Sequence, residues 1–266
     1  MMRKFGKTDR PHCTAFGKTS ACRTASGEKA PYCPDSAGTD FGCSAPSRKD
    51  ARIIFAAGMF LLLLELWKQC YLYWIYFGGH YNVWYLPFQL CSLPMYLCPL
   101  YALLAHRGKH FSGDLLLKAI AVFLQDFGLL GGIAALLVHE GFTYPGHLLL
   151  TLHGYVWHLV LIGLSLYLYR RRLAPLSARG FCLALPVFLS GAVIALVLNI
   201  LLHPYGDCDM FYLSPYHLSS QPVFRQLDAV VGRPVGMLFY LGAVTSGAFL
   251  LHCLYGYLAR KSAHRS

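Results

Sequence analysis

Apolar residues recur along most of this chain in runs long enough to form membrane-spanning helices, and short polar or charged segments separate the runs. A helix needs about 20 predominantly apolar residues to cross the hydrocarbon core of a bilayer. Strand alternation over about ten residues, which is typical of membrane barrels, does not recur. The pattern predicts an all-α, polytopic membrane helix bundle of about six transmembrane helices. The predicted spans are Ile53–Phe77, Trp84–Ala105, Leu115–Val138, His147–Tyr169, Gly180–Leu202 and Val235–Leu258.

Composition supports this class and sets the N-terminal segment apart. The 266-residue chain is 56% hydrophobic and only 13% charged, which excludes an ordinary soluble domain. Residues 1–51 are instead polar, and their cysteines fit neither the short spacing of a zinc site nor a disulfide framework. We expect a disordered tail there that contributes nothing to folding, a wrongly assigned start being the alternative. The bundle is then residues 52–260, and residues 261–266 form a basic C-terminal tail.

The basic residues follow the predicted topology. Of the 23 Lys and Arg residues, 20 fall on one side of the six spans, although the net charge of +11 alone would also suit a nucleic-acid-binding protein. Such an asymmetry is the positive-inside rule, so both termini are predicted to be cytoplasmic in a multi-pass protein of the cell membrane. The expected partners are membrane lipids and not nucleic acid.

Polar residues inside the spans are the candidates for function, because they are costly in lipid unless they face a bundle interior or water. Glu65, Lys68 and Gln69 share one helical face, so Glu65 and Lys68 can form an ion pair that either joins helices or belongs to a site. Asp126 is the one acidic residue in the middle of the third span, neutral if unpaired and charged if it lies opposite Lys68. We expect His158 to lie near the level of Asp126.

The stretch Leu86–Pro99 combines an amide, a thiol and a hydroxyl with three prolines, which predicts that it lines a cavity. At about 1.5 Å per residue, Cys91 and His153 lie at similar depths, roughly 10 Å and 9 Å below the outer ends of their helices. The two side chains could therefore face each other in the outer half of the membrane. Gln69 and Asn199 fall in the same half.

Several segments together resemble the YwaF-like family of bacterial integral membrane proteins. They are Leu86–Ser92, the step Leu152–Gly154, and Asn199 with Met210–Pro215. That family is similar to animal transmembrane acyltransferases that remodel ether phospholipids. The resemblance implies a Cys91 nucleophile with His153 as its partner. Many relatives have a histidine where this chain has Gln89.

This resemblance favours transfer of fatty acyl chains between lipids through an acyl-cysteine intermediate. A thiol attacks as the thiolate and needs a neighbouring base, which His153 can supply. Gln89, Asn199 or backbone amides freed by the prolines are candidate donors to the oxyanion. No cofactor and no metal site are expected.

Two alternatives use the same polar residues. A transporter or receptor would bind a small solute or a proton with Glu65, Lys68, Asp126 and His158. A helper protein would use buried polar groups only to hold helices together.

Overall fold

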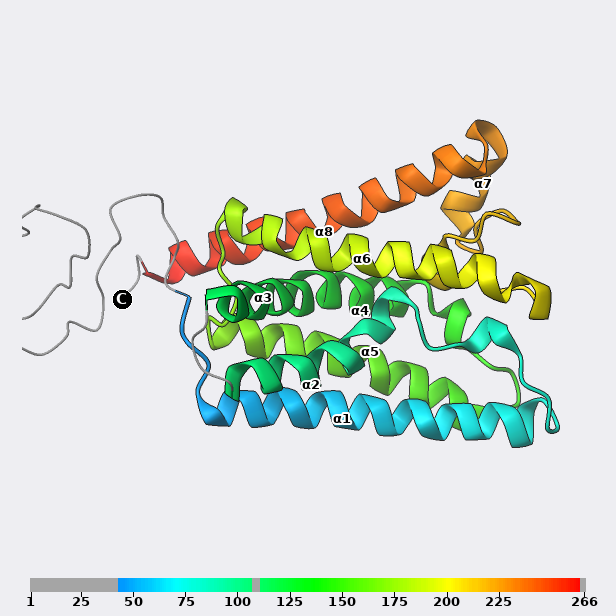
Figure 1. The fold of residues 1–266 in the computed structure, drawn as a ribbon, viewed down its shortest axis with the longest axis horizontal. Helices are drawn as coiled ribbons and strands as arrows, with labels where there is room; N and C mark the ends of the chain where they lie inside the picture. Colours follow the sequence, from blue (N-terminus) through cyan, green and yellow to red (C-terminus); the bar gives the residue numbers. More distant parts are fainter. Residues whose placement is uncertain (1–42, 107–110, 264–266) are drawn as a thin grey trace, which may run out of the picture. The chain divides into compact units, whose positions relative to one another are not determined.

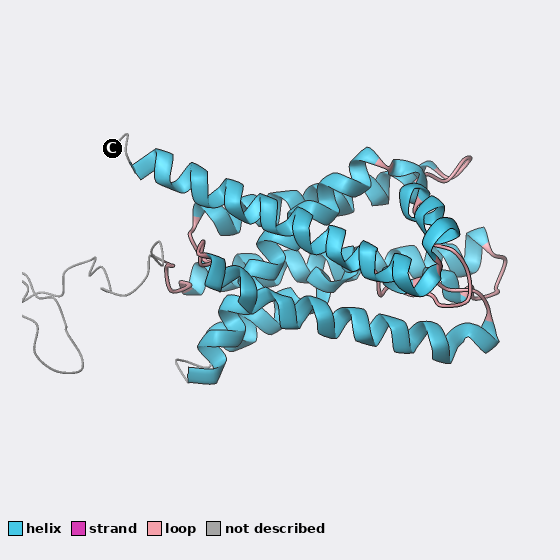
Figure 2. Cartoon of the chain, turned by 90° about the horizontal axis from the view of Figure 1, so that it is seen from above, coloured by secondary structure: helices cyan, strands magenta, loops and turns pink. Residues whose placement is uncertain are grey.

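Helices dominate the structure, a computed structural model that describes residues 43–106 and 111–263 (Figure 1). No strand occurs in this part of the chain (Figure 2), which confirms the all-α prediction. All of these residues belong to one compact unit, Asp40–Ser266; most of the predicted N-terminal tail and the last residues of the C-terminal tail lie outside the described residues. The α-helices are α1 (Arg48–Tyr71), α2 (Leu93–His106), α3 (Phe111–Val122), α4 (Gly128–Leu137), α5 (Leu148–Arg170), α6 (Ala178–Leu202), α7 (Pro222–Val231) and α8 (Arg233–Ala263).

Five helical segments of the described chain are long and apolar enough to cross a membrane. Large apolar side chains on them point outward, for example Leu63, Trp74 and Leu250, which are 60%, 69% and 69% exposed. Such contiguous apolar surface suits lipid and not water. The five segments match five of the six predicted spans to within a few residues. They are Arg48–Tyr76, Asp114–Leu137, Leu148–Arg170, Ala178–Tyr205 and Arg233–Ala263.

The second predicted span, Trp84–Ala105, is not one long helix. Its apolar helix, from Leu90 to His106, is shorter than the five long segments and opens with a 3-10 turn, Leu90–Ser92. Proline explains the difference. Pro94 lies in the first turn of α2, where its missing N–H costs no hydrogen bond, whereas Pro87 prevents the helix from extending further back. Residues 86–92 are thereby held outside regular α-helix.

α1 begins before the predicted boundary at residue 52, because residues 47–50 form its cap. The Ser47 hydroxyl accepts from the Asp50 N–H, and the Asp50 carboxylate accepts from the Ser47 N–H. The same carboxylate, which is buried, accepts from Tyr167 at 2.7 Å and from Arg171 at 2.8 Å. These residues therefore tie α1 to the end of α5. The expectation that residues up to 51 contribute nothing to folding stays a prediction, and these contacts argue against it for residues 47–50.

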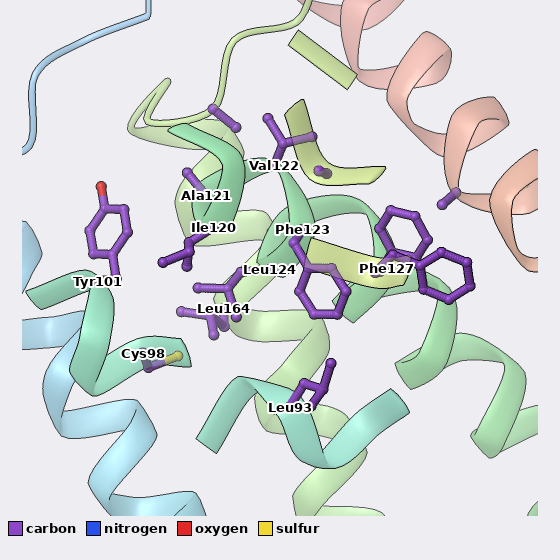
Figure 3. Close-up of a cluster of buried hydrophobic side chains, with 14 of the residues drawn as sticks. Leu93, Cys98, Tyr101, Ile120, Ala121, Val122, Phe123, Leu124, Phe127 and Leu164 are labelled. Atoms are coloured by element: carbon purple, nitrogen blue, oxygen red, sulfur yellow. The ribbon is translucent and has the colours of Figure 1, made fainter. Parts of the chain in front are cut away.

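The third span forms the centre of the core. α3 continues through a π-helical turn, Phe123–Phe127, into α4, and nearly every side chain around this turn is buried. Figure 3 shows Phe123 and Phe127 among aliphatic side chains of neighbouring helices. The Phe127 ring stacks on Phe188 of α6 at 4.8 Å. Helix α1 packs against α2, and Gly58 permits this, since a Cβ there would lie 2.6 Å from the Cβ of Cys98.

The two ends of the bundle are named here by their elements. The proximal end contains the start of α1, the end of α5 and the start of α6. The distal end contains the end of α1, the start of α5 and residues 203–232. A contact between the Tyr71 hydroxyl and His147 Nδ1, at 3.2 Å, joins α1 to α5 at the distal end.

Candidate functional site

The predicted ion pair on α1 is present. Lys68 Nζ lies 2.8 Å from Glu65 Oε1, and the Glu65 side chain is buried although it lies in an apolar helix. Gln69 donates to the same carboxylate oxygen at 2.7 Å and to the carbonyl of Tyr85, also at 2.7 Å. The three residues therefore form one polar group, which connects α1 to the segment that leads to Cys91.

Cys91 lies in the 3-10 turn before α2, and its backbone is fixed by α5. The indole N–H of Trp157 donates to the Cys91 carbonyl at 3.0 Å. On the α4 side, Gly131 is its neighbour, since a Cβ there would lie 3.9 Å from the Cys91 Cβ, an ordinary van der Waals contact. The half-buried thiol also interacts electrostatically with Lys68 and Glu65. It thus lies among α1, α4 and α5.

His153 is held between two tryptophans. Its ring stacks on Trp67 of α1 at 5.8 Å and lies 5.6 Å from the ring of Trp157. The side chain is only 8% exposed, yet its Nε2 has no hydrogen-bond partner in the described part of the chain. An imidazole nitrogen left unpaired in such a place is available to a substrate, a water molecule or a thiol.

Trp157 links Cys91 and His153, because it donates to the backbone of one and packs against the ring of the other. Among the described residues, no hydrogen bond joins the Cys91 thiol directly to His153. Lys68 interacts electrostatically with both. The assignment of the two as nucleophile and base stays a prediction.

Gln89 and Asn199 both bind the distal segment, defined here as Asp209–Ser214. Gln89 donates to the Asp209 carbonyl and accepts from the Phe211 N–H, both at 2.8 Å. Asn199 donates to the Met210 carbonyl at 3.0 Å and accepts from its N–H at 2.7 Å. These contacts occupy the amides that were expected to serve an oxyanion.

Two backbone N–H groups beside the Cys91 thiol are candidates for that role instead. The amides of Leu90 and Cys91 open the 3-10 turn and have no backbone acceptor in the described part of the chain, as expected for the first residues of a helix.

In the distal segment, burial raises the pKa of Tyr212 to about 12, so its phenol is neutral.

Asp126 is paired, and its partner is not Lys68 but a histidine of another helix. Its carboxylate contacts Nδ1 of His252, on α8, at 2.7 Å, and it accepts from Gln125 at 3.0 Å. His252 Nε2 lies 3.0 Å from the carbonyl of Ser177. Because a carbonyl can only accept, Nε2 carries a proton, and Asp126 and His252 share one further proton between them. The pair is fully enclosed and has no net charge.

His158 is also placed differently from the prediction. The backbone carbonyl of His158 lies next to Gly132, which is six residues beyond Asp126 along its helix. The His158 ring packs on Phe142 at 5.0 Å. At about 1.5 Å per residue, this puts His158 roughly 9 Å from the level of Asp126. Phe142 belongs to the connection between α4 and α5, so the His158 ring packs against this connection.

Three structurally important residues were not anticipated: His252, Trp157 and Arg233. Arg233 forms ion pairs with Asp228 at 2.6 Å and Asp209 at 3.5 Å, and it donates to the carbonyls of Ser214 and Tyr212. A signal for His252 was available, since an acidic residue inside one span calls for a partner in another.

A bundle of long apolar helices, with lipid-facing exteriors and buried polar groups between them, defines a multi-pass helical membrane protein. A comparison with known protein families matches residues 41–255 to the TMEM164 family. The chain belongs to this family. No curated protein and no solved structure matched it. The resemblance to the YwaF-like family stays a prediction.

Proposed function

We propose that this protein is a membrane-lipid acyltransferase that works through a thioester on Cys91. One observation carries the proposal: His153, whose buried Nε2 is unpaired, packs against Trp157, and the Trp157 indole holds the backbone carbonyl of Cys91. A buried imidazole nitrogen without a partner has no evident structural purpose. A base near a thiol is what thiolate chemistry requires.

In the first half-reaction, the Cys91 thiol gives its proton to His153, and the thiolate attacks the acyl carbonyl of a lipid ester. The amide N–H groups of Leu90 and Cys91 donate to the oxyanion that forms. When the ester C–O bond breaks, His153 returns the proton to the departing lipid oxygen. The products are the Cys91 thioester and a lipid with a free hydroxyl.

In the second half-reaction, the hydroxyl of another lipid attacks the thioester while His153 takes its proton. The C–S bond breaks, the Cys91 thiolate leaves, and His153 gives the proton back to it. A new lipid ester has formed, and the enzyme has returned to its starting state. Lipids would reach this site from the bilayer, past the partly exposed Trp67.

A transporter would instead depend on ionisable residues along a central path. Glu65 is already paired with Lys68 within α1, and Asp126 is paired with His252 of α8. The second pair joins two helices, which favours a structural role for it. We therefore place transport second.

Intact-protein mass spectrometry after incubation with phospholipid vesicles tests the enzyme proposal. We expect an added mass equal to an acyl chain, located on Cys91 by peptide mapping. Cys91→Ser should lose the adduct and nearly all transfer, because a hydroxyl is the weaker nucleophile. His153→Gln should lower the rate by roughly 10²–10⁴-fold.

The matched control is Cys98→Ser, which changes a fully buried cysteine on α2. It should keep the Cys91 adduct in full. An unmodified wild-type protein, or a Cys91→Ser protein with full activity, would contradict the proposal.

A further inference from the structure

Two adjacent residues of the distal segment have a left-handed backbone conformation. Phe211 and Tyr212 both have φ of 54°, a region that bulky L-residues avoid because of steric clashes. Phe211 is also completely buried and packs on the rings of Phe88 and Phe188. Such a conformation persists only when several contacts enforce it.

Hydrogen bonds from three elements supply that enforcement. Gln89 holds the Asp209 carbonyl and the Phe211 N–H. Asn199 of α6 holds both backbone groups of Met210. Arg233 of α8 donates to the carbonyl of Tyr212. Among these three, Gln89 lies two positions from Cys91.

Gln89 is also the N-cap of the turn that carries Cys91. The Ser92 N–H donates to the Gln89 carbonyl at 2.8 Å, and the Gln89 N–H points to the Ser92 hydroxyl at 3.4 Å. The backbone of Gln89 therefore closes the Cys91 turn, while its side chain is hydrogen-bonded to the distal segment. On the opposite side, the Trp157 indole holds the Cys91 carbonyl.

We propose that Gln89 is a positioning residue, which sets the place of the Cys91 thiol by anchoring its turn to the strained distal segment. The inference rests on the proposed function for its catalytic meaning, since it names what orients the nucleophile of that reaction. Gln89 itself touches neither the acyl group nor the thiol in this scheme. It acts through the backbone of the turn.

Gln89→Leu tests this, because it removes both side-chain hydrogen bonds and keeps a similar volume. We expect Cys91 to react about tenfold faster with a small alkylating reagent, as its turn becomes free to move. Acyl transfer should change the opposite way. The kcat should fall by roughly 10²-fold with little change in KM, because the thiol is misplaced while lipid binding is kept.

A second variant guards against a protein that fails to fold. Gln89→Asn keeps a neutral amide with both a donor and an acceptor but is one methylene shorter, so it weakens the two hydrogen bonds without adding a charge. Both rates should lie between those of the wild type and Gln89→Leu. Ser220→Ala is the matched control. It removes the hydroxyl that donates to Asp209 at 3.0 Å, a contact of the distal segment that does not involve the Cys91 turn. Both rates should remain within about twofold of the wild type.

Peptide-resolved mass spectrometry reads Cys91 and the buried Cys98 separately. Cys98 should stay protected in every variant. If Gln89→Leu exposes Cys98 as much as Cys91, Gln89 is a general stabiliser and the inference is wrong. It is also wrong if wild type and Gln89→Leu show equal alkylation and equal transfer. Absence of a Cys91 adduct in the wild type would instead count against the proposed function, with the alkylation rates still deciding the role of Gln89.

Discussion

At the scale of single residues, the Asp126–His252 pair offers a sharp test of what buried polar groups do here. Removing one partner of a buried pair leaves an uncompensated group and typically costs about 3–5 kcal/mol. We therefore expect Asp126→Leu and His252→Leu each to lower the unfolding temperature markedly, measured on the detergent-solubilised protein. The double variant should be more stable than the sum of the two losses predicts, since neither group is then left alone.

Strictly additive losses would mean that the two side chains act independently, which would contradict the contact between them. Thr245→Val is a suitable control on α8. Its hydroxyl donates only within its own helix, to the Leu241 carbonyl, so its replacement should have a small effect.

Which partners could be predicted from the sequence depended on their separation. Glu65 and Lys68 lie three positions apart, so helical geometry alone brings them together. Asp126 and His252 are 126 positions apart, and no local rule specifies which helices adjoin. The same limit applies to Gln89, whose amide chemistry was recognised and whose partners in the distal segment were not.

At the scale of elements, five spans were predicted closely because each is a continuous apolar run bounded by polar residues. The prediction for the second span, Trp84–Ala105, was wrong in its start. Hydropathy shows where a chain is apolar but not where a proline allows a helix to begin. The effect was local, and it placed Gln89 and Cys91 in a turn instead of a helix. The structure of the long connection after α6 could not be predicted either, because it depends on hydrogen bonds from Asn199 and Arg233, which lie in other elements.

The start of α1 yields a prediction from two truncations. Removing residues 1–42 should leave thermal stability unchanged, because their composition offers nothing to bury. Removing residues 1–50 should destabilise the protein, because it deletes the Ser47 cap, worth about 0.5–2 kcal/mol, and the Asp50 contacts to Tyr167 and Arg171. Thermal unfolding of both proteins measures the difference.

Equal stability of the two truncated proteins would show that the capping network is dispensable. Ser47→Ala separates the contributions within the full-length chain. It removes the hydroxyl and leaves the carboxylate of Asp50 in place, so it should cost less than the longer deletion.

At the scale of the whole molecule, the fold and the charge pattern together determine how the protein should sit in a membrane. Basic residues gather at the proximal end, in the stretch Arg170–Arg172 and at Arg179, Arg260 and Lys261, whereas the distal end has Arg225 and Arg233. The positive-inside rule then predicts that the proximal end lies in the cytoplasm.

Site-directed labelling of intact cells tests this orientation with one cysteine at each end. Asp207→Cys replaces a distal side chain that is 74% exposed, and Arg179→Cys replaces an exposed one at the proximal end. With a membrane-impermeant maleimide and peptide-resolved detection, Asp207→Cys should be labelled on intact cells and Arg179→Cys only after permeabilisation. The reverse pattern would invert the topology. It would also move the Cys91 site, which lies nearer the distal end, from the outer to the inner half of the bilayer, and with it the leaflet from which the proposed lipid substrates are drawn.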